Sequence, residues 1–167
     1  KGLEAEVERA QEKPVEALDV RDLTLRAAVE WNERLAEKDD RGAYAGATDL
    51  LNRALALSPN DGLALSLTAS YNLCDCVERW SKRIEDQQAI GAAAMEKALQ
   101  RDSESPSMLT LKGKLYAVQG KIEESLSIVE SALKRNPGYT DAFAVKAYDL
   151  LKLGKPQEAL VALNDIP

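Results

Sequence analysis

Apolar residues recur every three or four positions along most of the chain, which is the spacing of one face of an α-helix. The clearest stretch runs from Ser105 to Pro137, where two such segments are separated by Gly120 and closed by Pro137. The same spacing predicts further helices at about 19–37, 43–57, 60–78, 84–100, 140–153 and 156–163, with Asp22 as the N-cap of the first. No segment alternates with the period of two expected of a strand. The pattern therefore predicts an all-α chain of helix pairs.

The small and apolar residues of this stretch recur 34 positions later. The matched positions are Gly113 and Ala147, Leu111 and Val145, Gly120 and Gly154, Glu124 and Glu158, and Leu126 and Leu160. Earlier in the chain the period changes, because Ala54 and Ala98 occupy matching places but lie 44 residues apart, whereas Ala98 to Ala132 is again 34. We therefore predict repeats at about 23–59, 60–104, 105–138 and 139–167, the last one truncated. About ten extra residues lie near 76–87 in the second repeat.

A period of 34 residues with helix–turn–helix content is typical of tetratricopeptide repeats, and the chain resembles that family from about Leu23 to its end. The matching positions are Trp31, Gly42, Ala47, Ala54 and Pro59, then Gly113, Tyr116, Gly120, Ala132 and Pro137, then Ala147, Gly154 and Ala159. Ser125 departs from the pattern, since alanine is usual there. The resemblance implies a right-handed α-solenoid whose concave side is lined by the first helix of each repeat. Residues 1–18 are predicted to be a linker or a short helix.

Composition removes several classes of function. The chain has 22 Lys and Arg against 28 Asp and Glu, a net charge of −6, and no clustered basic stripe of the kind that binds nucleic acid. It has no histidine, the most common general base and metal ligand. Cys74 and Cys76 would point about 200° apart on a helix, and two thiols alone do not make a zinc site. We therefore expect no enzyme activity, no cofactor and no metal in this chain.

Two sets of residues are candidates for binding. By register with the family, the concave groove would include Asn32, Ser66, Ser70, Thr110, Lys114, Ala144 and Tyr148. They are mostly small or neutral, so we do not expect the family's Lys/Arg/Asn clamp for a peptide carboxylate, and they could equally be solvated or packing residues. The insertion carries the second set, which is Arg79, Trp80, Lys82 and Arg83, because Trp and Arg are frequent interface anchors. Packing over the second repeat is the alternative for Trp80, and Trp31 is expected in the core.

The expected function is that of a non-catalytic protein–protein interaction module that binds a protein or peptide, with no nucleic acid and no membrane segment. The arrangement also looks like the C-terminal repeat region of bacterial class III adenylate cyclases and winged-helix regulators. That resemblance implies the regulatory arm of a larger bacterial signalling protein, located in the cytoplasm. The alternatives are a free-standing adaptor or scaffold in secretion or envelope assembly, which would be periplasmic with an upstream signal or membrane segment, and a homodimerisation module.

Overall fold

The computed structural model describes residues 2–74, 81, 83–100 and 104–166. Within these residues it contains helices and turns and no strand, so the prediction of an all-α fold of tetratricopeptide type is confirmed. The α-helices are α1 (Gly2–Glu12), α2 (Val20–Ala36), α3 (Asp40–Leu57), α4 (Gly62–Asn72), α6 (Ile84–Leu99), α7 (Pro106–Val118), α8 (Ile122–Arg135), α9 (Thr140–Lys152) and α10 (Pro156–Asn164). A 3₁₀ turn, Val15–Ala17, lies between α1 and α2. Among the residues described, no helix combines the length and the apolar composition needed to cross a membrane.

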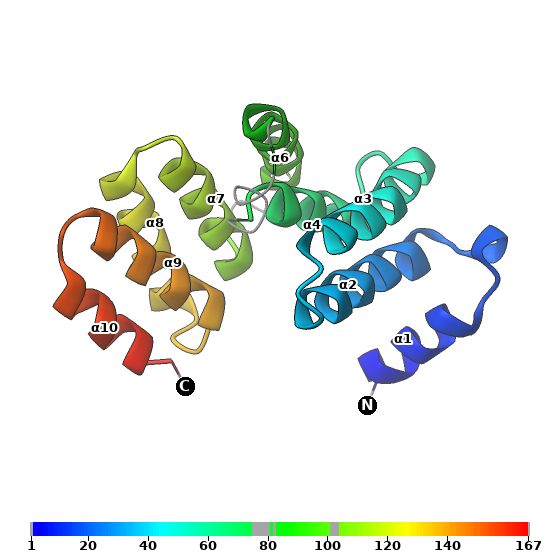
Figure 1. Ribbon diagram of the computed structural model, residues 1–167, viewed down its shortest axis with the longest axis horizontal. Coiled ribbons are helices and arrows are strands. Elements are labelled where there is room, and N and C mark those ends of the chain that lie inside the picture. Colours follow the sequence, from blue (N-terminus) through cyan, green and yellow to red (C-terminus); the bar gives the residue numbers. More distant parts are fainter. Residues whose placement is uncertain (1, 75–80, 82, 101–103, 167) are drawn as a thin grey trace. The chain divides into compact units, whose positions relative to one another are not determined.

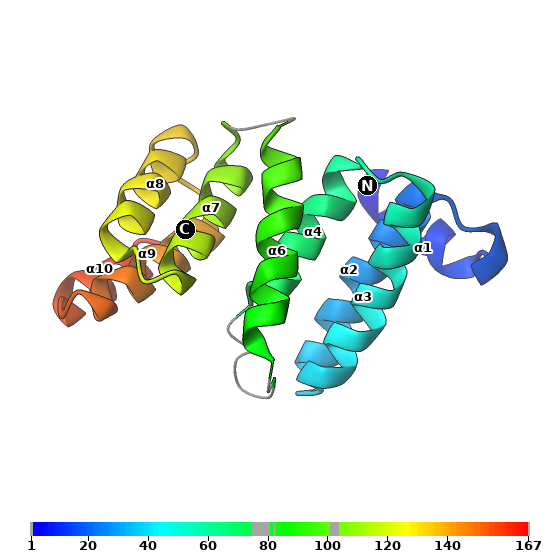
Figure 2. The same cartoon turned by 90° about the horizontal axis from the view of Figure 1, so that it is seen from above.

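The chain divides into two compact units, Lys1–Lys97 and Ala98–Pro167. The first unit is built on the antiparallel pair α2 and α3, with α1 against α2 and α4 against α3 (Figures 1 and 2). Its core is apolar and dominated by Leu23, Trp31 and Leu51, which are at most 7% exposed, with alanines filling the spaces between the helices. Aspartates cap three of its helices: the side chains of Asp19, Asp39 and Asp61 accept hydrogen bonds from the backbone of α2, α3 and α4.

The N-cap of α2 corrects the sequence interpretation by one turn. Asp19, not Asp22, is the cap, and its carboxylate accepts a hydrogen bond from the backbone N–H of Asp22 at 2.8 Å. Asp22 in turn accepts from the backbone N–H of Asp19 at 3.2 Å, which completes a reciprocal capping box. Residues 2–12, for which a linker was one of two expectations, form the helix α1. It is held against α2 by the Arg26 guanidinium, which donates to the last carbonyls of α1.

The second unit consists of two consecutive helix pairs, α7–α8 and α9–α10, with α9 also in contact with α7 and α8 (Figure 1). Each pair turns at a glycine with positive φ, 76° at Gly120 and 73° at Gly154, a conformation that other residues rarely adopt. These glycines are 34 residues apart, so the turn recurs with the predicted period. Val129, Ala132, Ala142 and Val145 form the buried layer between α8 and α9, against α7.

Close helix approach at small residues is also observed in the first unit. A Cβ added to Gly91 of α6 would lie 2.9 Å from Cγ of Leu73 and 3.1 Å from Cβ of Asn72 at the end of α4. The absence of a side chain at Gly91 therefore lets α6 approach the end of α4 closely. The third helix was expected to extend to about residue 78, but α4 ends at Asn72, and residues 75–80 and 82 lie outside the described part.

Candidate functional site

Four of the predicted groove residues lie in the second unit, on the two helices that begin its repeats. Lys114 of α7 and Tyr148 of α9 are partly buried, and Ala144 of α9 is exposed. Thr110 of α7 is only 2% exposed, and its hydroxyl donates to the carbonyl of Pro106 at 2.8 Å. Helices α7 and α9 are in contact, but the grouping of Lys114, Ala144 and Tyr148 into one surface stays a prediction, and Thr110 belongs to the packing.

The other three predicted groove residues lie in the first unit. Asn32 is exposed on α2, and Ser66 and Ser70 are partly buried on α4. The Ser66 hydroxyl donates to the carbonyl of Gly62 at 2.6 Å, a bond within its own helix. These residues are described separately from those of the second unit, and their grouping into one groove stays a prediction.

Of the four insertion residues singled out as an interface, Arg79, Trp80 and Lys82 lie outside the described residues. Arg83 is exposed and forms an ion pair with Asp86, at 2.5 Å between Nε and Oδ2, at the start of α6. The proposed interface at the insertion therefore stays a prediction. Trp31, expected in the core, is 7% exposed and stacks on Tyr71 with ring centroids 4.1 Å apart and planes 5° apart.

Lysine side chains lie beside tyrosine rings in the second unit. Lys152 Nζ lies 5.2 Å from the ring centroid of Tyr148, one turn away on α9. On α7 and the following turn, Lys112 and Lys121 lie 5.8 Å and 5.3 Å from the ring centroid of Tyr116. At these distances the ring quadrupole attracts the ammonium group. Helix α7 contains two lysines and no acidic residue, and Lys112 and Lys114 lie about 200° apart around its axis.

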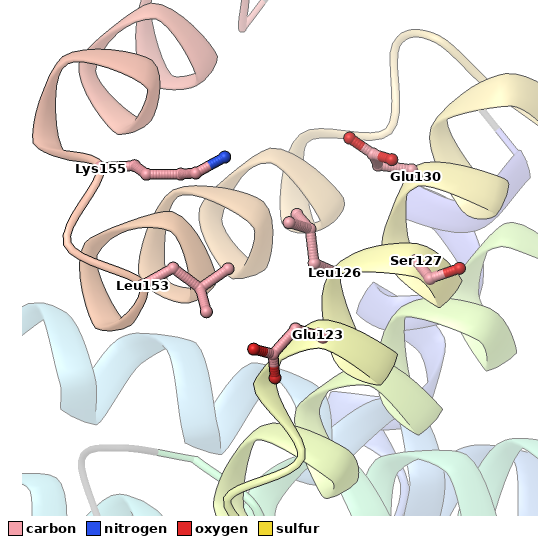
Figure 3. Close-up of a pocket in the computed structure, with 6 residues that line it drawn as sticks. All are labelled: Glu123, Leu126, Ser127, Glu130, Leu153 and Lys155. Atoms are coloured by element: carbon pink, nitrogen blue, oxygen red, sulfur yellow. The ribbon is translucent and has the colours of Figure 1, made fainter.

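A second concave surface of this unit, which the sequence interpretation missed, lies beside α8 and the turn between α9 and α10. It has a volume of about 450 Å³ and is lined by Glu123, Leu126, Ser127, Glu130, Leu153 and Lys155. Lys155 extends toward α8, and Leu126 and Leu153 lie between the charged groups (Figure 3). Its neighbour Lys146 forms an ion pair with Glu130 at 3.1 Å. A surface of this kind depends on which turns of three helices meet, and no sequence pattern predicts it.

The second unit also holds a fully buried carboxyl group, that of Asp149 on α9. Its Oδ2 lies 2.6 Å from the hydroxyl oxygen of Ser125 on α8. Burial raises the pKa of Asp149 to about 6, and the hydrogen bond with Ser125 opposes that rise. Both residues are 0% exposed, so no substrate can reach this serine. Over the part of the chain that the structure describes, no three acidic, cysteine or histidine side chains are placed to hold a metal ion.

Comparison with known proteins gives the fold. No protein-family model matches the sequence, and no curated protein matches it. Among solved structures, MamA of MSR-1 superposes with a TM-score of 0.58 at 15% sequence identity, over 97% of this chain and 90% of that one. MamA of AMB-1 gives a TM-score of 0.55 at 15% identity, over 97% and 86%. MamA is a tetratricopeptide-repeat protein, and the chain described here shares its helical repeat fold.

Proposed function

We propose that the chain is a non-catalytic interaction module that binds an acidic peptide segment of a protein partner along α7 and α9. The observation that carries the proposal is that α7, which bears Lys114, adjoins α9, which bears the exposed Ala144 and the partly buried Tyr148. Tetratricopeptide-type solenoids generally use such surfaces for binding extended segments or helices.

The chemistry of this surface favours acidic residues in the partner. Tyr148 offers a rigid, partly buried aromatic ring, which contributes contact area at little conformational cost. Lys152 is held over the Tyr148 ring and adds a cationic group there, and Lys114 adds a second one on the adjoining α7. The exposed Ala144 keeps the surface low enough for a peptide backbone to approach. A carboxylate-bearing segment would therefore gain charge pairing at the edges and apolar contact at the ring.

The cellular setting of the module belongs to the same proposal. The resemblance of the sequence to the C-terminal repeat region of bacterial class III adenylate cyclases and winged-helix regulators favours a regulatory arm of a larger signalling protein. In that setting a bound peptide would report the presence of a partner to the catalytic or DNA-binding domain of the same protein. A free-standing adaptor and a self-association module are the alternatives, and both would still use a protein-binding face.

The proposal is tested with a phage-displayed library of random 16-residue peptides selected against the whole chain. We expect enriched peptides to be acidic and to contain apolar residues. Affinities of the enriched peptides are then measured by fluorescence polarisation for wild type, Lys114→Glu and Tyr148→Ala. Each substitution should raise the Kd by roughly tenfold, about the value of one well-placed charge or aromatic contact. Added salt should weaken binding to the wild type because the lysines are partly solvated.

Lys134→Glu is the matched control, because Lys134 is exposed on α8 and lies outside this surface. It makes the same change of charge as Lys114→Glu and should leave the Kd within about twofold. Equal weakening by both charge reversals would show that only net charge matters and would contradict the site. Failure to enrich any peptide, or enriched peptides that bind all variants equally, would contradict the proposed function.

A further inference from the structure

Asp149 occupies a position that the repeat assigns to an apolar side chain. One period of 34 residues earlier the equivalent residue is Leu115, which is 6% exposed, whereas Asp149 is 0% exposed. Ser125 departs from the repeat as well, since it corresponds to the buried Ala159 of the fourth repeat. Gly113 corresponds to the buried Ala147 and keeps the small residue of the pattern. Polar groups thus replace apolar ones at one junction of α7, α8 and α9.

Ser125 contacts both Gly113 and Asp149. The Ser125 hydroxyl oxygen lies 2.8 Å from the backbone carbonyl oxygen of Gly113 and 2.6 Å from Oδ2 of Asp149. Gly113 makes this approach feasible, since a Cβ at that position would lie 2.4 Å from Cγ2 of Val129. The other carboxyl oxygen, Oδ1 of Asp149, is buried and has no hydrogen-bond partner among the described residues.

Counting hydrogens at this junction shows what a proton on Asp149 would add. A serine hydroxyl carries a single hydrogen and can donate only one bond, while its oxygen can also accept. The carbonyl of Gly113 and an ionised carboxylate can both only accept, so Ser125 can donate to only one of them at a time. A protonated Asp149 can itself donate to Ser125, and both contacts then carry a hydrogen. The length of the contact between Ser125 and Asp149, 2.6 Å, falls in the range of strong O–H···O bonds.

No charged group in the described part of the chain relieves the burial of this carboxyl. The charged side chains that flank the meeting residues in sequence are Lys112 and Lys114 on α7, Glu124 on α8, Lys146 and Lys152 on α9, and Glu158 on α10. Burial raises the pKa of Asp149 to about 6, the Ser125 hydrogen bond lowers it, and no charge within the described residues contributes. An ionised carboxylate here would be buried without a counter-ion, which is unfavourable.

We propose that Asp149, Ser125 and the Gly113 carbonyl form a proton-dependent clasp across α7, α8 and α9, so that the second unit is tightly packed when Asp149 is protonated and loosens when it ionises. The proton lets Asp149 donate to Ser125 while Ser125 donates to Gly113, and its loss leaves a buried carboxylate that competes with the Gly113 carbonyl for the one serine hydrogen. The folded state binds this proton more tightly than the unfolded chain does. The stability that this proton contributes to the second unit is therefore fully present below the ordinary pKa of an aspartate. It is lost as the pH rises through about 6.

The first test is direct observation of the carboxyl carbon by ¹³C NMR on the uniformly labelled whole chain. The Cγ shift of Asp149, assigned through its backbone, is followed from pH 3 to pH 8. We expect its titration midpoint near 6, roughly two pH units above that of exposed aspartates in the same spectra. A midpoint at or below 4 would overturn the proposal, because the carboxyl would then be ionised at neutral pH. This measurement needs no variant.

The second test compares Asp149→Asn and Ser125→Ala by hydrogen exchange, detected by mass spectrometry and corrected for intrinsic rates. An asparagine amide donates the same hydrogen to Ser125 but does not titrate. In wild type we expect protection of residues 140–152 to fall at least tenfold between pH 5 and pH 7.5. Asp149→Asn should abolish that fall, and Ser125→Ala should lower protection at both pH values while keeping the fall. The same pH dependence in Asp149→Asn as in wild type would overturn the clasp.

Discussion

Asp22 and Asp149 are both completely buried, one in each compact unit, and the fold satisfies them in opposite ways. Asp22 forms an ion pair with the ammonium of Lys13, and Arg9 Nη2 lies 3.6 Å from its Oδ1. Asp149 has a hydroxyl beside it and no cation. The hydrogen bond from Lys13 is the main reason that the pKa of Asp22 lies below its usual value, while burial raises that of Asp149.

The difference shows how one residue type performs two tasks in one chain. At Asp22 the charge itself is used, because it accepts hydrogen bonds at the N-terminus of α2 and anchors the end of α1 through Lys13. In the proposed clasp, the neutral carboxyl of Asp149 acts as a hydrogen-bond donor in an otherwise apolar layer. The two units should therefore respond to pH in opposite directions. Acid should weaken the contact between α1 and α2, and a rise in pH through about 6 should weaken the junction of α7, α8 and α9.

The largest expected effect comes from removing the cation at Asp22. Lys13→Met keeps much of the side-chain volume and leaves a buried carboxylate with only the more distant Arg9. We expect the free energy of unfolding of the first unit to fall by about 3 kcal/mol at pH 7, measured by urea denaturation with Trp fluorescence. Lys134→Met, at an exposed site, is the control and should change it by less than about 0.5 kcal/mol. A loss as small as the control's would mean that Asp22 is not charged in the folded state.

A double substitution that restores the apolar repeat should act in the opposite direction. Ser125→Ala with Asp149→Leu reproduces the residues found at Ala159 and Leu115. At pH 8 it should stabilise the second unit by about 2–3 kcal/mol, because a pKa near 6 instead of the ordinary value corresponds to that cost of ionisation. At pH 4.5 the gain should nearly vanish. Urea denaturation of wild type and variant at both pH values measures the difference, and an equal gain at both would contradict proton linkage.

The close approach at Gly113 should give a smaller effect. Gly113→Ala places a methyl group against Val129, and we expect a loss of about 1–2 kcal/mol in the free energy of unfolding despite the better helix propensity of alanine. At the matching position of the fourth repeat the reverse change, Ala147→Gly, should cost about 1 kcal/mol. Thermal unfolding followed by circular dichroism compares the two. A stabilised Gly113→Ala would show that the helices can separate there without penalty.

Helix capping gives the smallest of these contrasts between the two units. Asp61→Ala removes a side-chain cap from α4 in the first unit and should cost about 1 kcal/mol. In the second unit, α10 begins at Lys155 without a side-chain cap. Lys155→Ser would create a capping box with Glu158 and should add about 0.5–1 kcal/mol. Both changes are read from urea midpoints. The two substitutions should change the free energy of unfolding in opposite directions. No change for Lys155→Ser would mean that this helix end is too frayed to be stabilised by a cap.

The extent to which sequence predicted structure depends on how local each feature is. The bounds of α3, α6, α8 and α9 lie within a few residues of those predicted, because apolar spacing, glycines and prolines act within one helix. The cap of α2 was misplaced, because Asp19 and Asp22 are equally good caps and only the reciprocal capping box shows which role each plays. Thr110 was assigned to a surface and is buried, since repeat register places a residue on a helix but not its depth beneath a neighbour.

The sequence alone determined the class of fold, the 34-residue period and the turns at Gly120 and Gly154, because these follow from side-chain periodicity and from the backbone freedom of glycine. Ser125 was visible as a departure from the repeat, but its meaning was not. Only the tertiary structure decided that Ser125 meets Gly113 and Asp149, and that Lys13 meets Asp22. Such contacts join different helices, and whether a carboxyl holds its proton depends on which groups packing brings within hydrogen-bonding distance.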